Sequence, residues 1–408
     1  MQPASHDFSI FERPYLLVAQ LPYYQDESGS VWLNQLWHHD LVEHLNYLKD
    51  FTLCAPRLPK GEEPDLVRLV SPPGARLRIV PLPRQSTLGQ GLRGVPRTAA
   101  ALWRAIGDAD VVHVTISGWP PLNWIANPLA RLRRKRMLVV VENTWRRQVP
   151  RKSWVVKRVE ELLESAIEVM ARWSCNHADV ALFTQAGFRD TLFTHGQGAA
   201  YVTPAVWVNQ EDILDPATAE QLWARKLTEP VRLLLAGRLT APKGVDVLLS
   251  ALRMLDARGV AACVDIIGAG DRRDACLETA AALGSVRLSV LDPVPYGAPF
   301  FKLLERYHAL LIPSLTNEQP RVLFDANARA VPAIASSTEG LRPHIEEGRT
   351  GWLLPPGDVE ALAAAIERAS ASAPELRRMG MTALGAAPAF THRAMHQRRS
   401  SILRQHFA

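Results

Sequence analysis

The sequence predicts two α/β domains, each built on a doubly wound parallel sheet, and three observations lead to this prediction. The chain has 408 residues, which is too long for one ordinary hydrophobic core. Short apolar runs alternate with amphipathic segments at helical spacing. This alternation occurs in two successive blocks, separated by a stretch without clear periodicity at residues 202–229, where we place the linker. Alternating strands and helices are typical of parallel sheets covered by helices.

The first block begins with a buried strand at residues 15–20, a polar loop at 22–30 and a helix at 31–48. Runs that are β-branched or apolar on both faces predict further strands, at residues 51–55, 78–81, 110–116, 137–142 and 180–184. A long amphipathic helix is expected at residues 155–173, and a basic helix at 392–407.

The second block repeats the alternation of strands and helices. Its predicted strands are residues 231–236, 263–268, 286–291, 309–313 and 333–336, and its predicted helices are 245–258, 273–283, 300–307 and 321–330. In such sheets ligands bind beyond the carboxyl ends of the strands. We therefore expect the chemistry at these strand ends, in a cleft where two sheets face each other.

Composition excludes several classes of protein. Apolar residues make up 47% and charged residues 22%, an ordinary globular balance. The four cysteines are scattered without a CxxC pair, which argues against a zinc site or a disulfide framework and fits a reducing cytosol. The N-terminal residues lack the pattern of a signal peptide, and the apolar runs are far shorter than the ~20 residues that span a bilayer. We expect a cytoplasmic protein without a bound metal, either soluble or peripheral on the inner face of the membrane.

The net charge of +6 is unevenly distributed. Residues 131–158 hold a dense set of cations, in which Glu142 is the only acid. This segment is either a solvated face or a surface that meets an anionic membrane leaflet or an anionic acceptor. Four tryptophans lie in or near it and suit either lipid headgroups or a core: Trp119, Trp124, Trp145 and Trp154. A nucleic-acid partner is not expected, because no basic motif interleaved with aromatic residues is present.

Two glycine-containing segments follow predicted strands of the second block. In residues 237–244 (GRLTAPKG), Arg238 and Lys243 lie between a strand end and a helix start. Cations and helix N–H groups that converge there can bind phosphate, although such residues are also common in solvated loops. Gly268 and Gly270 follow the next strand, and they indicate either a close approach of the backbone to a ligand or a plain tight turn.

A third segment, residues 313–326 (PSLTNEQPRVLFDA), combines two acids with a predicted helix start. Pro320 suits the first turn of a helix, with Thr316 or Asn317 as its cap. Glu318 precedes this helix and Asp325 lies about two turns into it. A carboxylate can accept hydrogen bonds from sugar hydroxyls, and free N–H groups at the helix start suit a diphosphate. Asp325 could instead face solvent, but its neighbours in the sequence are apolar.

Together these segments resemble the family 4 glycosyltransferases, which have the GT-B fold. The resemblance runs from residue 231 to about residue 368, through GRLTAPKG, IIGAG, ALLIPSLTNEQPRVLFDANARAVPAIAS and EGLRPHIEEGRTGWLLPPGD. It implies two Rossmann-like domains, an acceptor-binding domain at residues 1–206 and a nucleotide-sugar-binding domain at 207–385. It also implies that residues 386–408 form a helix that returns to the first domain.

The resemblance also implies roles for individual residues. Arg238 and Lys243 match the basic pair that holds the donor diphosphate, Glu318 the acid that contacts the transferred sugar, and Asp325 the acid that binds the ribose. The remaining residues expected to line the donor site are Gly237, Gly268, Gly270, Asn317, Gln319, Pro320 and Arg321. The implied reaction is retaining, metal-independent transfer of a hexose from a UDP- or GDP-sugar to a glycan or lipid-linked saccharide, without a separate cofactor.

The sequence departs from the family pattern at several positions. Glu318 and Asp325 are seven residues apart, whereas the family has two glutamates eight residues apart. Counting back from Pro320 and Arg321 without a gap, the position of the first acid is occupied by Asn317. We expect that a shortening by one residue moved this acid to Glu318. His113 matches the first histidine of a strand-end pair.

Three other positions also differ: Thr115 replaces the second histidine of that pair, Glu142 stands where another histidine is common, and Glu339 replaces a glycine. These departures leave open a non-catalytic GT-B partner protein. A hydrolysing sugar-nucleotide epimerase, which shares this architecture, is also left open.

Overall fold

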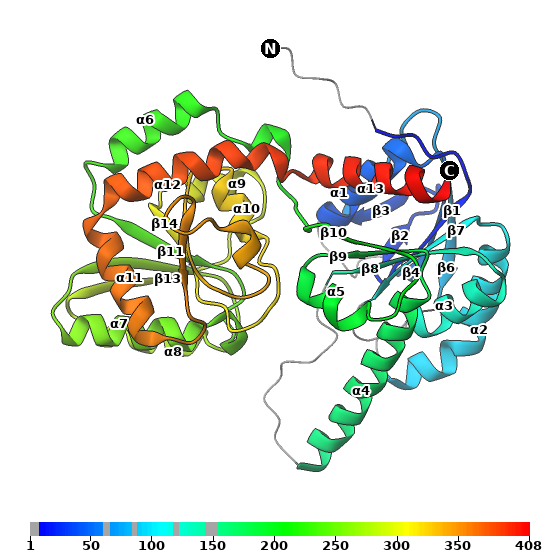
Figure 1. The fold of residues 1–408 in the computed structure, drawn as a ribbon, viewed down its shortest axis with the longest axis horizontal. Helices are drawn as coiled ribbons and strands as arrows, with labels where there is room; N and C mark the ends of the chain where they lie inside the picture. The colour runs from blue at the N-terminus through cyan, green and yellow to red at the C-terminus, as the bar shows by residue number, and fades with distance from the viewer. Residues whose placement is uncertain (1–7, 60–65, 84–87, 117–121, 143–153) are drawn as a thin grey trace. The chain divides into compact units, whose positions relative to one another are not determined.

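A computed structural model describes residues 8–59, 66–83, 88–116, 122–142 and 154–408 (Figure 1). The chain divides into two compact units. The N-terminal unit comprises Met1–Pro204 together with Met395–Ala408, and the C-terminal unit comprises Ala205–Ala394. Among the described helices, none combines the length and apolar character needed to cross a membrane. All four cysteines are free.

The N-terminal unit is built on a parallel sheet in the order β6-β4-β1-β7-β8-β9-β10. These strands are β1 (Tyr15–Val18), β4 (Asp50–Leu58), β6 (Arg76–Leu82), β7 (Val111–Ile116), β8 (Arg136–Val141), β9 (Val180–Phe183) and β10 (Ala199–Val202). Three short strands extend the sheet beyond β4: β2 (Tyr23–Gln25), β3 (Val31–Asn34) and β5 (Leu66–Arg68). The helices of the unit are α1 (Gln35–Tyr47), α2 (Leu88–Gly107), α3 (Asn123–Leu132), α4 (Trp154–Asn176), α5 (Ala186–Leu192) and α13 (His392–Phe407).

Helices cover both faces of this sheet, as the alternation of side chains along its strands requires. In β1, Leu16 and Val18 pack into a core with α2, α3 and α4. Tyr15 and Leu17 point to the other face and pack into a core with α1 and α13. The last helix of the chain therefore belongs to the N-terminal unit, where Phe407 is fully buried and α13 lies beside α1 (Figure 1).

The structure corrects two element predictions. The predicted helix at residues 31–48 begins only at Gln35, because the side chain of Asn34 caps it by accepting from the Trp37 amide at 2.9 Å. The linker predicted at residues 202–229 contains a helix, α6 (Pro216–Lys226). Pro216 occupies the first turn of α6, where proline is favoured, and Asp215 caps the helix.

The C-terminal unit contains a six-stranded parallel sheet in the order β13-β12-β11-β14-β15-β16. Its strands are β11 (Arg232–Ala236), β12 (Ala262–Ile267), β13 (Val286–Leu291), β14 (Ala309–Ile312), β15 (Ala333–Ser336) and β16 (Gly351–Leu354). Its remaining helices are α7 (Val245–Ala257), α8 (Arg273–Ala282), α9 (Ala298–Leu304), α10 (Val322–Asn327), α11 (Val359–Ala371) and α12 (Ala373–Ala386). Short 3₁₀ turns lie at Gln210–Asp212, Ala241–Lys243, Arg342–His344 and Ala387–Ala389.

Both faces of this second sheet are also covered by helices. In β11, Leu233 and Leu235 pack with α7 and α11, whereas Leu234 packs on the opposite face with α9 and α10. Numbered along the chain, the strands of this sheet follow the order 3-2-1-4-5-6, which is the order of doubly wound dinucleotide-binding sheets. The predicted fold class, two Rossmann-like α/β domains, is therefore confirmed.

Candidate active site

The candidate site lies where the strand order of the C-terminal unit reverses. From β11 the chain continues outward to β12 and β13, and from the neighbouring β14 it continues outward to β15 and β16 on the other side. The loops that leave β11 and β14 must therefore separate, which opens a crevice at their carboxyl ends. A cavity of about 180 Å³ lies there. Five predicted site residues line it: Gly237, Arg238, Lys243, Pro320 and Arg321.

Gly244 joins the two loops of this crevice. It has φ 75°, and a Cβ atom on it would lie 1.8 Å from the carbonyl oxygen of Pro313. No side chain fits in that space, so only glycine allows the loop after β11 to pack on the loop after β14. The Leu315 amide also donates to the Pro242 carbonyl at 2.9 Å. These contacts hold Lys243, the residue just before Gly244, against the second loop.

The structure brings Arg238, Lys243 and Glu318 together. Lys243 Nζ donates to Glu318 Oε2 at 3.1 Å, and Arg238 Nη2 lies 4.0 Å from the same oxygen. The side chains of Lys243 and Glu318 are about one-fifth exposed, whereas that of Arg238 is 74% exposed. Two cations thus converge on one carboxylate oxygen, which occupies the position between them and partly neutralises them.

Residues on either side of Glu318 hold its loop in place. The Gln319 Oε1 atom accepts from the Ala205 amide at 3.0 Å, and Asn317 Oδ1 makes a long contact of 3.4 Å with the Glu339 amide. A Cβ on Gly340 would lie 2.4 Å from the Glu318 carbonyl oxygen, so the turn at residues 339–340 supports the Glu318 backbone. This role of Gly340 was not predicted from the sequence, although the residue lies in one of the segments that carry the resemblance to the family.

The start of α10 differs from the prediction. The helix spans only Val322–Asn327, and no side chain caps it. Neither Thr316 nor Asn317 is its cap, because both lie too far ahead in the loop and the Asn317 amide group contacts another turn instead. Pro320 lies just ahead of the helix, and the Arg321 guanidinium is stacked 5.3 Å from the ring centre of Trp207.

Asp325 is buried within α10 and is not in the cavity with the cations. Its side-chain oxygen Oδ1 accepts from the Tyr296 hydroxyl at 3.0 Å, and only 4% of the residue is exposed. Burial raises the pKa of Asp325 to about 7, against the opposing effect of the Tyr296 hydrogen bond. A role for Asp325 with the ribose stays a prediction. No spacing in the sequence could have identified Tyr296 as its partner.

Gly268 and Gly270 bring one loop backbone against another. A Cβ on Gly268 would lie 1.8 Å from the Gly237 carbonyl oxygen, and one on Gly270 would lie 2.2 Å from the Leu239 carbonyl oxygen. The Leu239 amide donates to the Ala269 carbonyl at 2.8 Å. These contacts fix the loop that carries Arg238, and they explain both glycines without a ligand.

The structure places the strand-end residues of the first block, His113, Thr115 and Glu142, in different surroundings. His113 is buried in the middle of β7, where its Nδ1 atom lies 2.8 Å from the Tyr15 hydroxyl. Burial holds the pKa of His113 well below its usual range, so this histidine is neutral and shielded from solvent. Thr115 is partly exposed near the end of the same strand. Glu142 follows β8 and lies 3.4 Å from Arg399 of α13.

Asp40, His44 and His396 are the one set among the described residues whose side chains have the spacing of metal ligands, within 4.8 Å of one another. These side chains already contact each other. His396 Nε2 lies 3.1 Å from Asp40 Oδ1, and His44 Nδ1 lies 2.9 Å from the Asp40 carbonyl. Burial alone would raise the pKa of Asp40, but the two imidazoles outweigh it and hold the pKa well below the usual range. The set therefore ties α13 to α1.

In the basic segment at residues 131–158, some of the described cations contact other residues of the protein and others are exposed to solvent. Lys135 Nζ donates to the Gly107 carbonyl at 2.9 Å, Arg136 donates to the Phe407 carbonyl at 2.5 Å, and Arg133 stacks on Trp103. Three of its arginines are exposed: Arg131, Arg134 and Arg158. Trp124, for which the sequence left both an interface and the core open, packs against the core. Residues 143–153, with Trp145 and four of the cations, lie outside the described residues, as does Trp119.

Comparisons with known proteins identify the family. A model described as "Glycosyl transferase 4-like domain" matches residues 39–204, and one described as "Glycosyl transferases group 1" matches residues 230–372. The chain belongs to this glycosyltransferase family. The amylovoran biosynthesis glycosyltransferase AmsK of Erwinia amylovora is 36% identical over 154 residues, which are 35% of this chain and 37% of that protein. The match thus spans about a third of the length of this curated relative.

Solved structures show the same fold along nearly the whole chain. Sucrose-phosphate synthase from Thermosynechococcus elongatus has a TM-score of 0.68 at 18% identity, and the match covers 96% of this chain and 98% of that one. HepE from Anabaena, solved in complex with UDP-glucose, has a TM-score of 0.63 at 13% identity, and the match covers 96% of this chain and all of that one. The GT-B fold predicted from the sequence is therefore confirmed.

Proposed function

We propose that this chain is a retaining, metal-independent glycosyltransferase that moves a hexose from a UDP- or GDP-sugar to a lipid-linked saccharide or polysaccharide intermediate. The observation that carries the proposal is the convergence of Arg238 and Lys243 at the crevice between β11 and β14. A structural neighbour that was solved with UDP-glucose, and a relative named for amylovoran biosynthesis, support a nucleotide-sugar donor and a polysaccharide product.

The proposed mechanism follows from the charges at this site. A diphosphate placed between the two cations displaces the Glu318 carboxylate from Lys243, because it offers more negative charge and more acceptor oxygens. Glu318 is then released to accept hydrogen bonds from the hydroxyls of the transferred hexose. The acceptor hydroxyl attacks the anomeric carbon of the hexose from the same face from which the phosphate leaves. The bond between this carbon and the phosphate oxygen breaks, and the proton of the hydroxyl passes to that oxygen. Lys243 and Arg238 stabilise the negative charge that develops on the leaving diphosphate.

A Lys243→Ala variant tests the proposal. A thermal-shift screen first selects the nucleoside diphosphate and the sugar nucleotide that stabilise the wild-type protein. Loss of Lys243 should then lower the rate of donor turnover on the order of 10²-fold or more, as for the loss of one preorganised donor. Arg258→Ala, which removes an exposed cation at the end of α7, is the matched control and should leave the rate unchanged.

Two results would contradict the transferase proposal in different ways. A Lys243→Ala rate within a few-fold of wild type would remove the role of the cation pair. If calorimetry with UDP and GDP detects no binding to the wild-type protein, the non-catalytic GT-B partner protein takes its place. Conversion of a UDP-sugar in the absence of any acceptor, with free sugar as a product, would indicate the hydrolysing epimerase.

For the acceptor we propose a lipid-linked saccharide, reached by a cytoplasmic protein that lies peripherally on the inner face of an anionic membrane. The support is the exposed Arg131 and Arg134 beside Leu132, an apolar residue that is 71% exposed. Such a combination suits an interface between headgroups and acyl chains. Co-sedimentation with vesicles that contain or lack anionic lipid tests this location, and no binding to either would refute it.

A further inference from the structure

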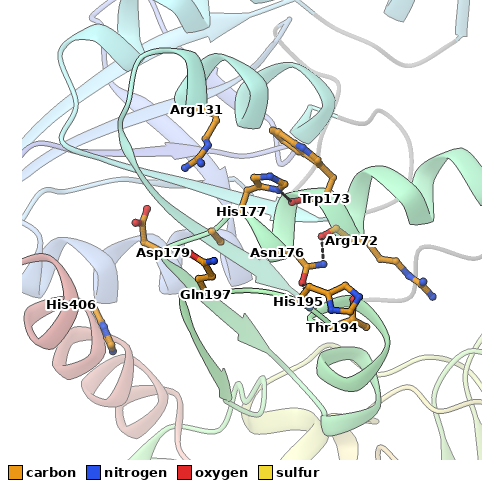
Figure 2. A pocket seen from close by; sticks show the side chains of 12 residues that line it. Arg131, Arg172, Trp173, Asn176, His177, Asp179, Thr194, His195, Gln197 and His406 are labelled. Atoms are coloured by element: carbon orange, nitrogen blue, oxygen red, sulfur yellow. Dashed lines mark hydrogen bonds between the residues drawn. The ribbon is translucent and has the colours of Figure 1, made fainter.

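A second cavity, of about 870 Å³, lies in the N-terminal unit (Figure 2). We call it the basic pocket. It lies at the amino ends of the strands, because Asp179 directly precedes β9 and Gly198 directly precedes β10. Parallel sheets bind their usual ligands at the opposite, carboxyl ends. The basic pocket is therefore separate from any acceptor site that the strand order of this sheet would create.

Cationic or ionisable side chains reach the basic pocket from four separate elements. They are Arg131 of α3, Arg172 of α4 with His177 just after it, His195 of the loop after α5, and His406 of α13. His406 Nε2 already lies 2.7 Å from the Tyr201 hydroxyl, so it adds to the charge of the pocket and not to its free donors. Asp179 is the one acid among the lining residues, and its Oδ2 atom already accepts from the Met137 amide at 2.7 Å. The charge of the lining is thus suited to an anion.

Several hydrogen-bond donors of the basic pocket have no partner of their own. Within the described part of the chain, no carboxylate pairs with Arg131, and no bond engages the side chains of His195 and Gln197. The neighbouring Arg172 differs, because it pairs with Glu168 at 2.9 Å and extends away from the other labelled side chains (Figure 2). Arg131 is therefore the guanidinium that this pocket offers to a ligand.

The donors of the basic pocket are held in place by the surrounding structure. The rings of His177 and Trp173 are stacked with centroids 4.7 Å apart, and His177 Nδ1 donates to the Trp173 carbonyl at 2.8 Å. Nε2 is therefore the nitrogen that faces a ligand, and it donates to a phosphate oxygen when the ring is protonated. Asn176 Oδ1 accepts from the His195 amide at 2.7 Å, and Asn176 Nδ2 donates to the Leu192 carbonyl at 3.0 Å. The loop that carries His195 is thereby fixed to α4. Binding of a ligand therefore costs little conformational entropy, because the loop is already ordered.

We propose that the basic pocket binds a phosphate-bearing ligand, with Arg131 and His177 as its principal contacts. A guanidinium presents paired N–H donors that match two phosphate oxygens, and the imidazoles and the Gln197 amide add donors around them. The phosphate can belong to a soluble phosphorylated saccharide or to the headgroup of an anionic lipid. This inference does not depend on the proposed transferase activity, because no residue of the basic pocket belongs to the donor site.

Calorimetric titration with inorganic pyrophosphate tests the basic pocket, provided that the donor site is removed from the measurement. The titration is therefore made in a Lys243→Ala background, in which binding should remain. Adding Arg131→Ala and His177→Ala should weaken this binding about tenfold or more, as expected for the loss of charge-assisted hydrogen bonds. Adding Arg134→Ala instead removes the same charge three residues from Arg131, and it should change the affinity less than about twofold if the effect is local.

Vesicles distinguish the two sources of the phosphate. If pyrophosphate binds as described and anionic vesicles do not, the ligand is a soluble phosphate ester; if both bind and the same substitutions abolish both, the ligand is a lipid headgroup. If pyrophosphate does not bind, but vesicles of phosphatidylcholine with phosphatidylglycerol do and the Arg131 and His177 substitutions abolish that binding, the ligand is a lipid headgroup. The proposal is overturned if neither probe binds, or if Arg134→Ala weakens the binding of pyrophosphate as much as the substitutions in the pocket do. Loss of nucleoside diphosphate binding in Lys243→Ala reports only on the donor site, so the two proposals can fail independently.

Discussion

Replacing Glu318 by Gln should make the protein bind nucleoside diphosphates more tightly and turn over the donor more slowly. The Glu318 carboxylate lies 3.1 Å from Lys243 Nζ, so a diphosphate that binds at Lys243 must break this ion pair. The pair is only about one-fifth exposed, which places its strength between a surface ion pair of about 0.5 kcal/mol and a charged hydrogen bond of about 2–3 kcal/mol. Arg238 is mostly exposed and lies 4.0 Å away, so it adds little.

An interaction of about 1–2 kcal/mol corresponds to a change of roughly 5- to 30-fold in affinity, since about 1.4 kcal/mol is tenfold. Calorimetry with UDP and GDP should therefore give a dissociation constant for Glu318→Gln that is lower by that factor. Turnover of the sugar nucleotide should fall, because in the mechanism that we propose the amide replaces the carboxylate that contacts the hexose. Glu339→Gln neutralises an exposed acid on the neighbouring turn and should change the affinity by less than about threefold. Unchanged or weaker binding to Glu318→Gln would refute the competition between this carboxylate and the diphosphate.

Two further predictions concern stability and are read from denaturant unfolding. Because burial raises the pKa of Asp325 to about 7, the folded state loses stability as the pH rises from about 4 to about 7. Asp325→Asn removes this loss and keeps an acceptor for Tyr296, so its free energy of unfolding should rise relative to wild type over that range, by at most about 4 kcal/mol. Asp256→Asn is the control, because backbone hydrogen bonds lower the pKa of Asp256 from its ordinary value of 3.8, so this variant should show no trend between about pH 4 and 7 and should lose stability relative to wild type only as the pH rises toward about 4. Asp40→Asn should cost about 1–3 kcal/mol at neutral pH, because it weakens the contact with His396 that ties α13 to α1. This cost should shrink as the pH falls through the lowered pKa of Asp40, and a cost independent of pH would contradict the ionic character of the contact.

The strands that position the candidate site could be predicted because both faces of each strand are covered by helices. β11 and β14 read as continuous apolar runs for this reason. The loops between such strands and the following helices are short, so Arg238, Lys243 and Glu318 had to lie near the same strand ends. Their convergence at the crevice therefore followed from strand positions and chain order alone.

The elements that the sequence did not predict are those where side-chain contacts override the local pattern. The strand β3 precedes α1 without a break in apolar spacing, and only the cap formed by Asn34 separates the two. The burial of individual side chains could not be predicted from the sequence either. His113 and Asp325 occupy positions at which the family pattern places functional groups, yet the structure buries both and pairs each with a tyrosine from a distant segment. Spacing along the chain gives order and direction, but it gives no information on how far a side chain lies from solvent.

The shift of the acid by one residue shows how a small departure from a family pattern changes the chemistry. Counted from Pro320, the acid's usual place holds Asn317, but the structure directs the Asn317 side chain to the turn at residues 339–340. The next side chain, that of Glu318, reaches Lys243. The acid is therefore placed by the contact of its loop with Gly340, and not by its count from the helix. A site whose own carboxylate neutralises its cations in this way selects for a ligand with more negative charge than a single carboxylate, and a diphosphate meets that requirement.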